Sequence, residues 1–600
     1  MTLTAPPHYT VLASDLQAHL FEVRCDLGDV RDAVEMRMPA WIRGSYLVRD
    51  FAKHVTRIEA TRGSTAVAIA RTDKNSFRIQ AGDGALVLRW WVYAYDESVR
   101  KAYLDARRGF FNGSSLFFQP VGWSGGCTLD ISAPSDSSWK LATTLKPLKV
   151  DARGFGRYTA ADYEDLIDHP VEMGDFQRVD FVAADTPHAF ILSGRCEADG
   201  ARLAADAKKI CEAQHALFRG EPKLDQYLFL TRVVGSGYGG LEHRSSTALI
   251  CSRNDLPRQD MAGPSTELRT GLPRDYRTFL GLVSHEYFHL WNVKRITAKA
   301  FSDSDLAAEA YTRDLWHYEG VTSYYDDLFL LRAGLLDAAT YLDLLAETAT
   351  RLERAPGRLQ HTLADASFET WVKYYQPDEN SPNATTNYYV KGALAALCLD
   401  LHLRLHSQST LDDVMRVLWA RYGSKNIGVP EGGLEAVAQE ICGLDLKPQF
   451  DAWLRSTAEL PVAELLAAFG IKAERRAAIS EADTGGRVSG KPLAAALGLR
   501  LRGNELAVAH VVNGRPAERA GLAGGDVLVA LDGYKLTPGN WSLRSALLAA
   551  GRKVPLHYFR GDELFETSIT PEAAPLDTWT FTLADADAQT LARRKTWLSC

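Results

Sequence analysis

His285-Glu286-Tyr287-Phe288-His289 is the stretch of this 600-residue chain that decides its fold. Residues four apart lie on one face of a helix, so the side chains of His285 and His289 can reach one metal ion. Glu286 lies beside them and can polarise a water molecule bound to that ion. Two imidazoles, a carboxylate and an open water position are the pattern of a catalytic zinc site. The stretch therefore predicts a helix that carries two zinc ligands and a catalytic carboxylate.

The residues around this motif favour a helix. Apolar side chains recur at helical spacing at Tyr276, Phe279, Leu280, Val283, Tyr287 and Leu290. This spacing gives a helix an apolar face to pack against a core. The alternative interpretation is an amphipathic helix with two surface histidines. A third protein ligand, which a catalytic zinc site needs, would favour the metal.

A second segment offers that third ligand. Residues 315–325 read LWHYEGVTSYY, and Glu319 follows His289 by 30 residues, which leaves room for a loop and a return helix. The alternative ligand is His317, two residues before Glu319. Because residues two apart face different sides of a helix, both cannot bind the same ion.

The two segments together resemble the gluzincin metallopeptidases, in which the Glu of an L-W-x-x-E-G-x-x-S-Y segment is the third zinc ligand. The gap between the motifs is longer than in the aminopeptidase N branch and is similar to that of the glycyl aminopeptidase family. Thermolysin-type enzymes place an Asp four residues after the ligand Glu, where this chain has Ser323. The resemblance implies one zinc ion held by His285, His289 and Glu319, with Glu286 as the catalytic base.

A glycine-rich segment upstream is typical of an exopeptidase. Residues 237–243 read GYGGLEH and follow an apolar run that predicts a strand. Because glycine lets a backbone approach a ligand closely, Gly239 and Gly240 are predicted to line the substrate site. The segment resembles the G-x-M-E-N motif of gluzincin aminopeptidases, and Glu242 takes the position that binds the substrate's free α-ammonium group. It departs from that motif at Leu241 and His243. The alternative is a hairpin turn with an exposed glutamate.

A further segment resembles the part of aminopeptidases that stabilises the oxyanion. Residues 387–392 read NYYVKG and lead into an apolar helix. Y-x-K-G at a helix start matches the family's oxyanion-stabilising Tyr at Tyr389, with Tyr388 as the second choice. A phenol donor aimed at the developing charge lowers a barrier by on the order of a few kcal/mol. The alternative is a packed aromatic pair, the usual fate of Tyr in an apolar segment.

The resemblance implies an aminopeptidase that removes small first residues, glycine or alanine, from peptides with a free N-terminus. A fixed carboxylate at Glu242 would favour a cationic N-terminus and reject a blocked one. One competing hypothesis is a zinc endopeptidase of the same fold, in which Glu242 has another role. The other is an inactive peptidase fold that binds peptides through a PDZ domain.

The predicted PDZ domain rests on residues 513–533, which resemble the signature S-P-A-x-x-A-G-L-x-x-G-D-x-I-x-x-I-x-G. Residues 496–499 (ALGL) take the position of the carboxylate-binding loop, with Ala496 in place of the usual first glycine. PDZ domains add a peptide strand to a sheet edge and hold its C-terminal carboxylate on backbone N–H groups. The implied partner is a peptide or protein C-terminus. The alternative is a domain that only packs on the catalytic part or restricts access to it.

The whole chain is predicted to be a multidomain α+β protein. Residues 1–175 are rich in β-formers and predict an N-terminal β-sandwich-like domain. Residues 176–475 predict a thermolysin-like zinc peptidase domain that is helical from about residue 390. A polar linker at 481–491 leads into the PDZ domain, 485–573, and residues 574–600 are predicted to be a C-terminal tail with a last helix.

One segment of the N-terminal domain also resembles a signature of the glycyl family. Residues 39–46 read PAWIRGSY, and Arg43 stands where Pro is usual. In relatives such domains flank the cleft. Nearby Arg49, Arg100 and Tyr103 could reach that cleft, but the expectation for each is a solvated surface position.

Composition excludes several classes of function. The net charge of −7, from 68 basic and 75 acidic residues, argues against a general nucleic-acid binder. No apolar run approaches the roughly 20 residues of a membrane span, and residues 1–12 lack a signal-peptide pattern. Eight scattered cysteines form no C-x-x-C pair, which argues against a thiolate zinc site or a dense disulfide frame. A cytoplasmic location is expected, with a periplasmic or secreted one as the alternative if a signal peptide has been removed.

Overall fold

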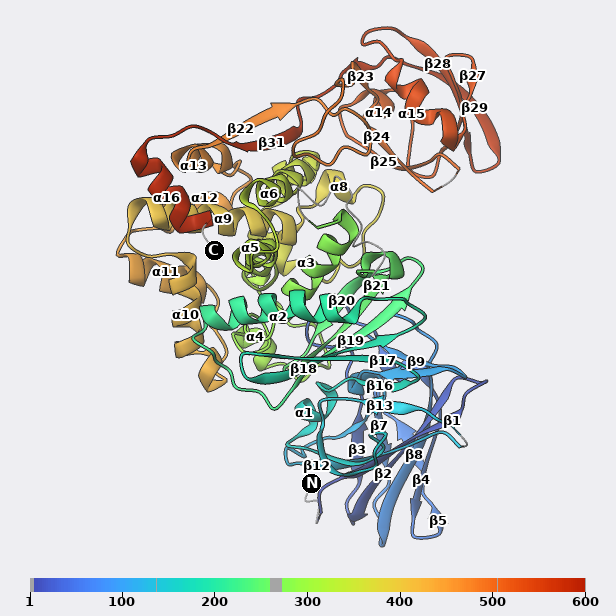
Figure 1. Ribbon diagram of the computed structural model, residues 1–600. Coiled ribbons are helices and arrows are strands. Elements are labelled where there is room, and N and C mark those ends of the chain that lie inside the picture. Colours follow the sequence, from blue (N-terminus) through green and yellow to red (C-terminus); the bar gives the residue numbers. More distant parts are fainter. Residues whose placement is uncertain (1–4, 136, 259–271, 504, 599–600) are drawn as a thin grey trace. The chain divides into compact units, whose positions relative to one another are not determined.

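The computed structural model describes residues 5–135, 137–258, 272–503 and 505–598, so the outermost residues of the predicted first domain and tail lie outside it. The chain forms two compact units (Figure 1). The first contains residues 1–311 and 419–430, and the second contains residues 312–418 and 431–600. Among the described residues, no helix combines the length and apolar character needed to cross a membrane.

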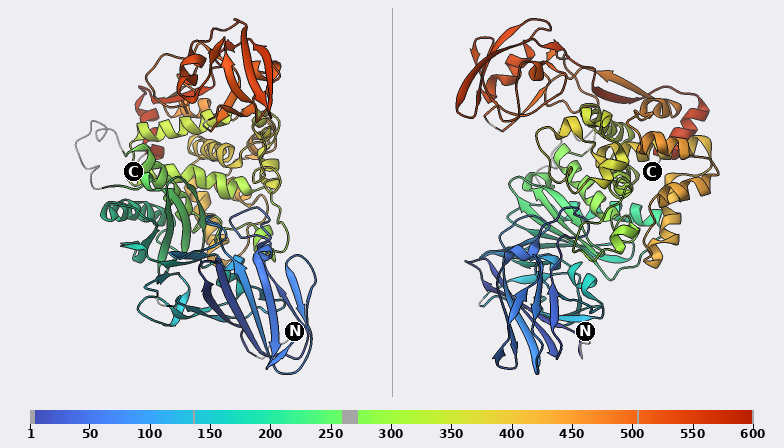
Figure 2. Two further views of the ribbon diagram at one scale, coloured as in Figure 1. Left: turned by 90° about the vertical axis from the view of Figure 1, so that its right-hand side faces the viewer. Right: turned by 180° about the vertical axis from the view of Figure 1, so that it is seen from behind.

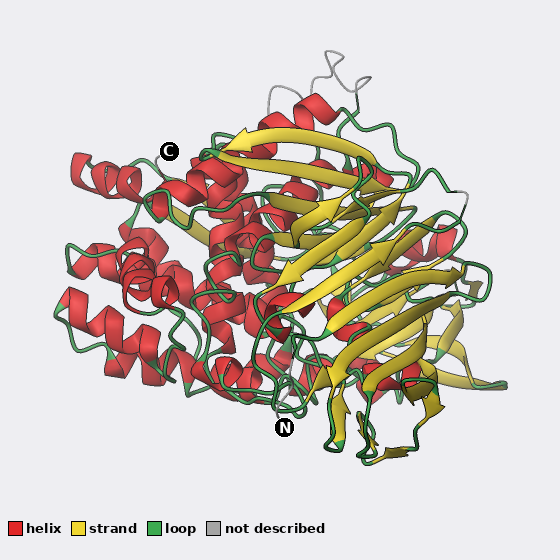
Figure 3. Cartoon of the chain, turned by 90° about the horizontal axis from the view of Figure 1, so that it is seen from below, coloured by secondary structure: helices red, strands yellow, loops and turns green. Residues whose placement is uncertain are grey.

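The N-terminal region is rich in β-strands, as predicted. Its largest sheet has eight strands, in the order β14 (Lys146–Val150), β15 (Gly156–Ala160), β12 (Cys127–Ser132), β1 (His8–Asp15), β2 (Leu20–Asp29), β8 (Ala85–Tyr93), β4 (Val55–Arg62) and β5 (Thr65–Ala66). Buried residues alternate with more exposed ones along β8, so the sheet presents one face to a core. Strands are yellow in Figure 3.

Two smaller sheets complete this region. One has the order β13 (Lys140–Ala142), β16 (Val171–Gly174), β10 (Arg108–Phe111) and β9 (Ala102–Leu104). The other has the order β11 (Gln119–Pro120), β3 (Val34–Arg37), β7 (Ser76–Ile79) and β6 (Ile69–Arg71). A short helix, α1 (Tyr163–Ile167), follows β15 and is capped at its N-terminus by the side chain of Asp162.

The same unit contains a mixed five-stranded sheet. Its order is β17 (Gln177–Ala183), β18 (Thr186–Ser193), β19 (Tyr227–Val234), β21 (Ser246–Ser252) and β20 (Tyr238–Glu242). Strands β18, β19 and β21 are parallel, and β20 runs antiparallel to β21 at the end of the sheet. Two helices pack against this sheet, α2 (Gly200–Leu217) and α3 (Arg274–Phe288).

Helix α3 is the helix predicted around the histidine motif. Its predicted apolar face is buried, with Tyr276, Phe279, Leu280, Val283 and Tyr287 each at most 2% exposed. The helix ends at Phe288, one residue earlier than the motif, but His289 keeps helical dihedral angles (φ −61°, ψ −16°). His285 and His289 therefore still lie on one face.

The second unit is mainly helical before residue 470. It contains the π-helical turn η6 (Trp316–Gly320), then α5 (Val321–Arg332), α6 (Ala338–Glu353), α7 (Leu363–Phe368), α8 (Ser381–Ala384) and α9 (Tyr388–His406). Next come α10 (Leu411–Arg421), whose last three residues are counted with the first unit, α11 (Gly433–Cys442), α12 (Lys447–Leu454) and α13 (Val462–Ala468). Helix α9 is apolar on all sides and buried along most of its length, as expected of a core helix.

A separate sheet with its own core lies near the C-terminal end (Figure 2). Its main path is β24 (Leu499–Arg502), β25 (Ala507–Val511), β26 (Val527–Leu531), β28 (Val554–Arg560) and β29 (Glu563–Ile569), and β27 (Tyr534–Lys535) pairs with β26. Two helices accompany it, α14 (Pro516–Arg519) and α15 (Pro538–Ala546). We call this part, residues 497–571, the C-terminal module.

The segment predicted as a tail contains regular structure. Strand β31 (Thr578–Leu583) pairs antiparallel with β22 (Ile471–Arg476), and α16 (Ala588–Leu598) follows it. A short pair, β23 (Ala495–Ala496) and β30 (Glu572–Ala573), joins the two ends of the C-terminal module. The module is thus inserted between strands that pair with each other in the second unit.

Candidate active site

Four predicted residues of the first unit lie together. Glu242 stands at the end of β20, and Glu286 and His289 come from α3 and the residue after it. Each of these three side chains has a possible ligand atom within 4.8 Å of those of the other two. The rings of His285 and His289 lie 4.7 Å apart between centroids and nearly perpendicular, at 87°. Two imidazoles and two carboxylates therefore meet at one edge of the five-stranded sheet.

The orientation of His289 suits a metal ligand. Its Nδ1 is 2.6 Å from the backbone oxygen of Asn292, and the ring is 2% exposed. A carbonyl can only accept a hydrogen bond, so Nδ1 carries the proton and Nε2 presents its lone pair. A histidine that donates from one nitrogen to a backbone carbonyl is the usual arrangement of a zinc ligand. The residues present therefore fit a zinc ion.

Glu286 lies directly against strand β20. It is 5% exposed, and a Cβ added at Gly240 would be only 2.0 Å from its Oε1. The Thr247 hydroxyl, on the neighbouring strand β21, is 3.4 Å from Glu286 Oε2. Glycine at position 240 is therefore needed because a carboxylate of the site occupies the space of a side chain. Gly239 has φ +153°, a conformation that favours glycine.

A buried ionic cluster supports the chain just after Glu242. Asp168 Oδ1 accepts from Lys294 Nζ at 2.6 Å and lies 3.2 Å from His243 Nδ1, and Oδ2 accepts from the backbone N–H of Arg244 at 2.9 Å. Burial alone would raise the pKa of the Asp168 carboxyl, but Lys294 and His243 outweigh it and hold that pKa well below its usual range. Burial lowers the pKa of His243, against the opposing effect of Asp168. The cluster fixes the end of β20 through ionised Asp168.

The sequence did not point to Asp168 or Lys294, and of three residues expected at a solvated surface, Tyr103 is buried and Arg100 reaches β20. Arg100 donates from Nη2 to the backbone oxygen of Gly240 at 3.2 Å, Arg49 donates to the Ser45 hydroxyl at 2.6 Å, and Tyr103 is 5% exposed. Tyr103 is therefore buried, whereas Arg49 and Arg100 are partly exposed and hold backbone or neighbouring side chains through these hydrogen bonds. The one sequence signal for the Asp168–Lys294 cluster is His243, which stands where the G-x-M-E-N motif has Asn.

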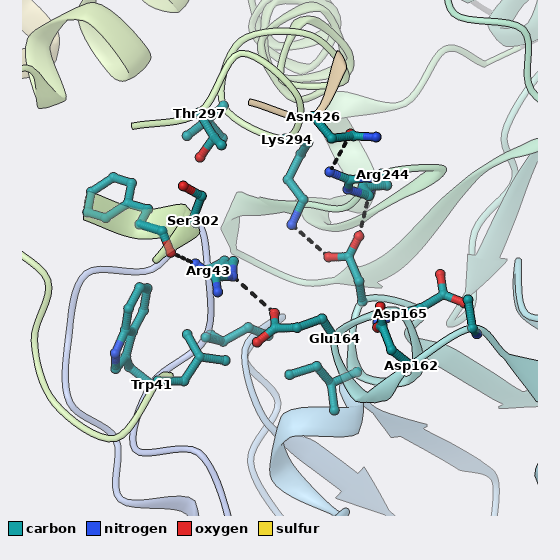
Figure 4. Close-up of a pocket in the computed structure, with 18 of the residues that line it drawn as sticks. Trp41, Arg43, Asp162, Glu164, Asp165, Arg244, Lys294, Thr297, Ser302 and Asn426 are labelled. Atoms are coloured by element: carbon teal, nitrogen blue, oxygen red, sulfur yellow. Dashed lines mark hydrogen bonds and ion pairs between the residues drawn. The ribbon is translucent and has the colours of Figure 1, made fainter. Parts of the chain in front are cut away.

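A cavity of about 460 Å³ lies next to this cluster (Figure 4). Its wall includes the turn at residues 41–46, helix α1 and residues of the segment 293–306. The basic side chains of the wall are paired with other wall residues: Arg43 with Glu164, Lys294 with Asp168, and Arg244 with Asn426. The turn at 41–46 thus lines the cavity and, through Gly44, also contacts Glu242.

Glu319 and Tyr389 both belong to the second unit. Glu319 lies in η6, is 2% exposed, and stands in a π-helical turn of the kind that recurs at functional sites. Tyr389 is in the first turn of α9, which begins there because the Asn387 side chain accepts from the backbone N–H groups of Tyr389 and Val390. Burial, and then Glu319, raise the pKa of Tyr389 well above its usual value. Tyr389 is therefore a protonated donor at neutral pH.

The two alternatives in this unit are packed residues. Tyr388 is fully buried, and its hydroxyl accepts a hydrogen bond from Thr370 at 2.9 Å. His317 is also fully buried, and burial lowers its pKa to about 3. Helix α9 meets η6 at two glycines, since a Cβ on Gly320 would be 2.5 Å from Gly392 Cα. This close approach keeps Glu319 and Tyr389 on neighbouring backbones.

Two parts of the chain match models of known peptidase families. Residues 8–175 match the peptidase M61 N-terminal domain, and residues 278–395 match the M61 glycyl aminopeptidase. A crystal structure of an aminopeptidase N family protein from Idiomarina loihiensis is 36% identical, covers 99% of this chain and 100% of its own, and superposes with a TM-score of 0.94. No curated protein matches the chain.

A more distant similarity is found with the M1 zinc metallopeptidase from Deinococcus radiodurans. It is 12% identical, covers 76% of this chain and 94% of its own, and gives a TM-score of 0.46. The two matched domains and the relative that covers the full length show that the chain belongs to the M61 glycyl aminopeptidase family of peptidases.

Proposed function

We propose that this peptidase is a zinc-dependent aminopeptidase that removes small N-terminal residues, glycine and alanine, from peptides with a free N-terminus. The observation that carries the proposal is the second buried carboxylate, Glu242, beside Glu286 and His289. Hydrolysis in the middle of a peptide needs the metal ligands and the base but gives no role to a buried carboxylate at this point. A primary ammonium group is the substrate feature that such a carboxylate would bind.

One zinc ion is proposed to be held by His285, His289 and Glu319. The assignment is supported by the motif spacing, by the orientation of His289 and by the burial of Glu319. Glu319 belongs to the other unit, so its approach to the histidines is part of the proposal. When bound, zinc would act as a Lewis acid and lower the pKa of a water molecule.

Three side chains of the protein would carry out proton transfer, oxyanion stabilisation and amine binding. Glu286 accepts the proton of the attacking water as it adds to the first peptide carbonyl, and then donates that proton to the leaving amine. Tyr389, kept protonated, donates a hydrogen bond to the oxyanion. Glu242 holds the substrate's ammonium group, and Gly239 and Gly240 of the same strand line the substrate site. Because the N-terminus is held at this point, only the first peptide bond lies beside the attacking water.

The remaining domain assignments are also proposals. Residues 176–475 are proposed to form a thermolysin-like domain, and residues 485–573 a PDZ domain whose partner is a peptide or protein C-terminus. The second is supported by a cavity of about 330 Å³ next to β24, the first strand in its sheet, which is lined by Ala496, Gly498 and Leu548 and also by residues outside the proposed domain, such as Arg354 and Arg358. A terminal strand with a neighbouring cavity is what strand addition requires.

One assay tests the proposed activity. Alanyl anilide and its N-acetylated twin are compared, each with and without a chelator, in the wild type and in Glu286→Gln. We expect hydrolysis of the free amine only, lost with the chelator and lowered by at least about 10³-fold in Glu286→Gln. Equal cleavage of the acetylated twin would mean an endopeptidase. Cleavage of neither substrate by protein shown to contain zinc would mean a binding protein.

A further inference from the structure

The carboxylate of Glu242 lies against the backbone of Gly44, a residue of the N-terminal domain. A Cβ added at Gly44 would lie 2.3 Å from Oε1, 2.5 Å from Cδ and 2.6 Å from Oε2 of Glu242. Because these three distances are nearly equal, that position is above the face of the carboxylate and not at one oxygen edge. Hydrogen bonds to a carboxylate lie near its plane, so Gly44 covers a face that such bonds do not use.

The backbone at Gly44 also requires glycine for a local reason. Ser45 donates its backbone N–H to the oxygen of Ile42 at 3.0 Å, which closes a four-residue turn. Gly44 has φ +93°, whereas φ of Arg43 is not positive, and this combination is a type II turn. Type II turns need glycine at the third position and favour proline at the second. Arg43 therefore occupies the position where proline would fix the turn.

Arg43 holds this turn in place with its side chain. Its Nε donates to Glu164 at 3.1 Å, Nη2 donates to the backbone oxygen of Ser304 at 3.0 Å, and Nη1 donates to the backbone oxygen of Phe301. Figure 4 shows the guanidinium group between Glu164 and the segment that carries Ser302. Three anchors on two elements fix the turn relative to the core of the first unit, and so fix Gly44 over Glu242.

We propose that Gly44 is a positioning residue for amine recognition, which rests on the proposed role of Glu242. The backbone of Gly44 packs against one face of the Glu242 carboxylate. This contact fixes the plane of the carboxylate, in which its oxygens accept hydrogen bonds from a primary ammonium group. Glu242 is 3% exposed, so it cannot swing into solvent to make room for a side chain. A methyl group at position 44 would turn the carboxylate out of that plane and weaken binding of the free N-terminus, while Glu286 and the histidines stay in place.

The test compares two glycine-to-alanine substitutions with matched backbone strain. Gly84 has φ +94°, and a Cβ there would meet its nearest atoms only at 3.8 Å. Gly44→Ala and Gly84→Ala therefore place alanine at the same unfavourable φ, and only the first collides with Glu242. For alanyl anilide we expect Gly44→Ala to raise KM about tenfold and change kcat less than about threefold, with Gly84→Ala within about twofold of the wild type. Equal KM in the two variants would overturn the proposal.

A second pair of variants tests the contact itself. Glu242→Asp withdraws the carboxylate by one methylene group, which leaves space for the methyl group. In that background we expect Gly44→Ala to add no KM increase and to lower the unfolding midpoint no more than Gly84→Ala does. If Gly44→Ala unfolds the wild-type protein, its recovery in the Glu242→Asp background supports the contact, and unfolding in both backgrounds overturns it.

Glu242→Gln separates this inference from the proposed function. If Glu242→Gln leaves KM for alanyl anilide unchanged, the amine-binding role of Glu242 is wrong, and the role of Gly44 fails with it. If Glu242→Gln raises KM and Gly44→Ala does not, only the inference about Gly44 is wrong.

Discussion

Two glycines bring backbone against the two buried carboxylates of the site. Gly240 lies against Glu286, and Gly44 lies against Glu242, with virtual Cβ contacts of 2.0 and 2.3 Å. Both carboxylates are at most 5% exposed, so their positions are set by packing and not by solvent. In the proposed reaction, the base Glu286 and the amine-binding Glu242 act on different groups of the substrate. The backbone of one glycine packs against each carboxylate, which keeps the two carboxylates in separate, fixed positions.

Alanine at position 240 should damage the reaction step and not substrate binding. Gly240 has no positive φ, so Gly240→Ala adds no backbone strain, and its only effect is the collision of its methyl group with Glu286. We expect kcat to fall about 100-fold with KM changed less than about threefold, as when a general base is displaced.

The matched control for this substitution is Gly235→Ala, five residues earlier. A Cβ there would meet Arg253 Nη1 at 3.4 Å and no carboxylate of the site. It should keep kcat within about twofold of the wild type. A kcat for Gly240→Ala equal to that of Gly235→Ala would show that Glu286 is not held by β20.

The sequence placed the residues whose spacing is local and missed those whose contacts are distant. His285, Glu286 and His289 lie within one helical turn, so covalent geometry alone brings them to one face. Gly44 meets Glu242 across 198 positions of the chain, and Asp168 meets Lys294 across 126. No periodicity encodes such contacts, because they depend on how the N-terminal sheets pack beside β20.

At the scale of elements, the sequence predicts those with continuous apolar patterns and does not predict pairing between distant, partly polar strands. The helix at α3 and the apolar helix at α9 were predicted because their apolar residues form continuous faces or buried runs. The pairing of β22 with β31 was not predicted, since about 100 residues separate the two strands and at least half of the residues in each strand are polar. Residues 574–600 therefore looked like a tail.

A buried carboxyl that links two elements should make stability depend on pH. Asp314 precedes η6, is 6% exposed, and its Oδ2 accepts from the backbone N–H of Gly432 at 2.6 Å. Burial raises the pKa of Asp314 to about 7 from a usual 3.8. Because the folded-state pKa is the higher one, its contribution to stability is fully present below about pH 4 and is lost as pH rises through about 7.

The measurement is the free energy of unfolding of the wild type and of Asp314→Asn between pH 4 and 8. Asn keeps an acceptor for Gly432 but does not titrate. We expect the wild type to lose stability relative to the variant as pH rises, by at most about 4 kcal/mol at 1.36 kcal/mol per pKa unit. Exposed Asp585→Asn serves as the control. A difference between Asp314→Asn and wild type that does not change with pH would contradict the raised pKa.

At the scale of the molecule, the C-terminal module is an insertion and not an appendage. Strand β31 returns from it to pair with β22, and the Trp579 backbone N–H donates to Thr350 of α6 at 2.8 Å. Beyond it, Trp597 of α16 is 1% exposed and donates from its indole N–H to the Tyr324 hydroxyl at 3.1 Å. The last residues of the described chain thus complete the core of the second unit.

Removing the module and removing the chain end should therefore have opposite consequences. Ala496 and Glu572 are paired in antiparallel register, so residues 497–571 can be replaced by Asn-Gly, which favours a two-residue hairpin turn. A second variant ends at Lys491 and loses β31 and α16 as well. We expect the excised protein to unfold within about 5 °C of the wild type and to keep its hydrolysis of alanyl anilide. The truncated protein should unfold at least about 10 °C lower, because burying Trp597 alone is worth about 3–5 kcal/mol.

Point substitutions in α16 check the same argument without deleting chain. Trp597→Ala removes the buried ring that packs on Tyr341 and Phe469, whereas Leu591→Ala alters a residue that is 46% exposed on the same helix. We expect the first to lower the unfolding midpoint and the second to leave it within about 1 °C. If the protein ending at Lys491 is as stable as the excised one, β31 and α16 do not belong to the core. In that case residues 574–600 form a tail that does not contribute to the core.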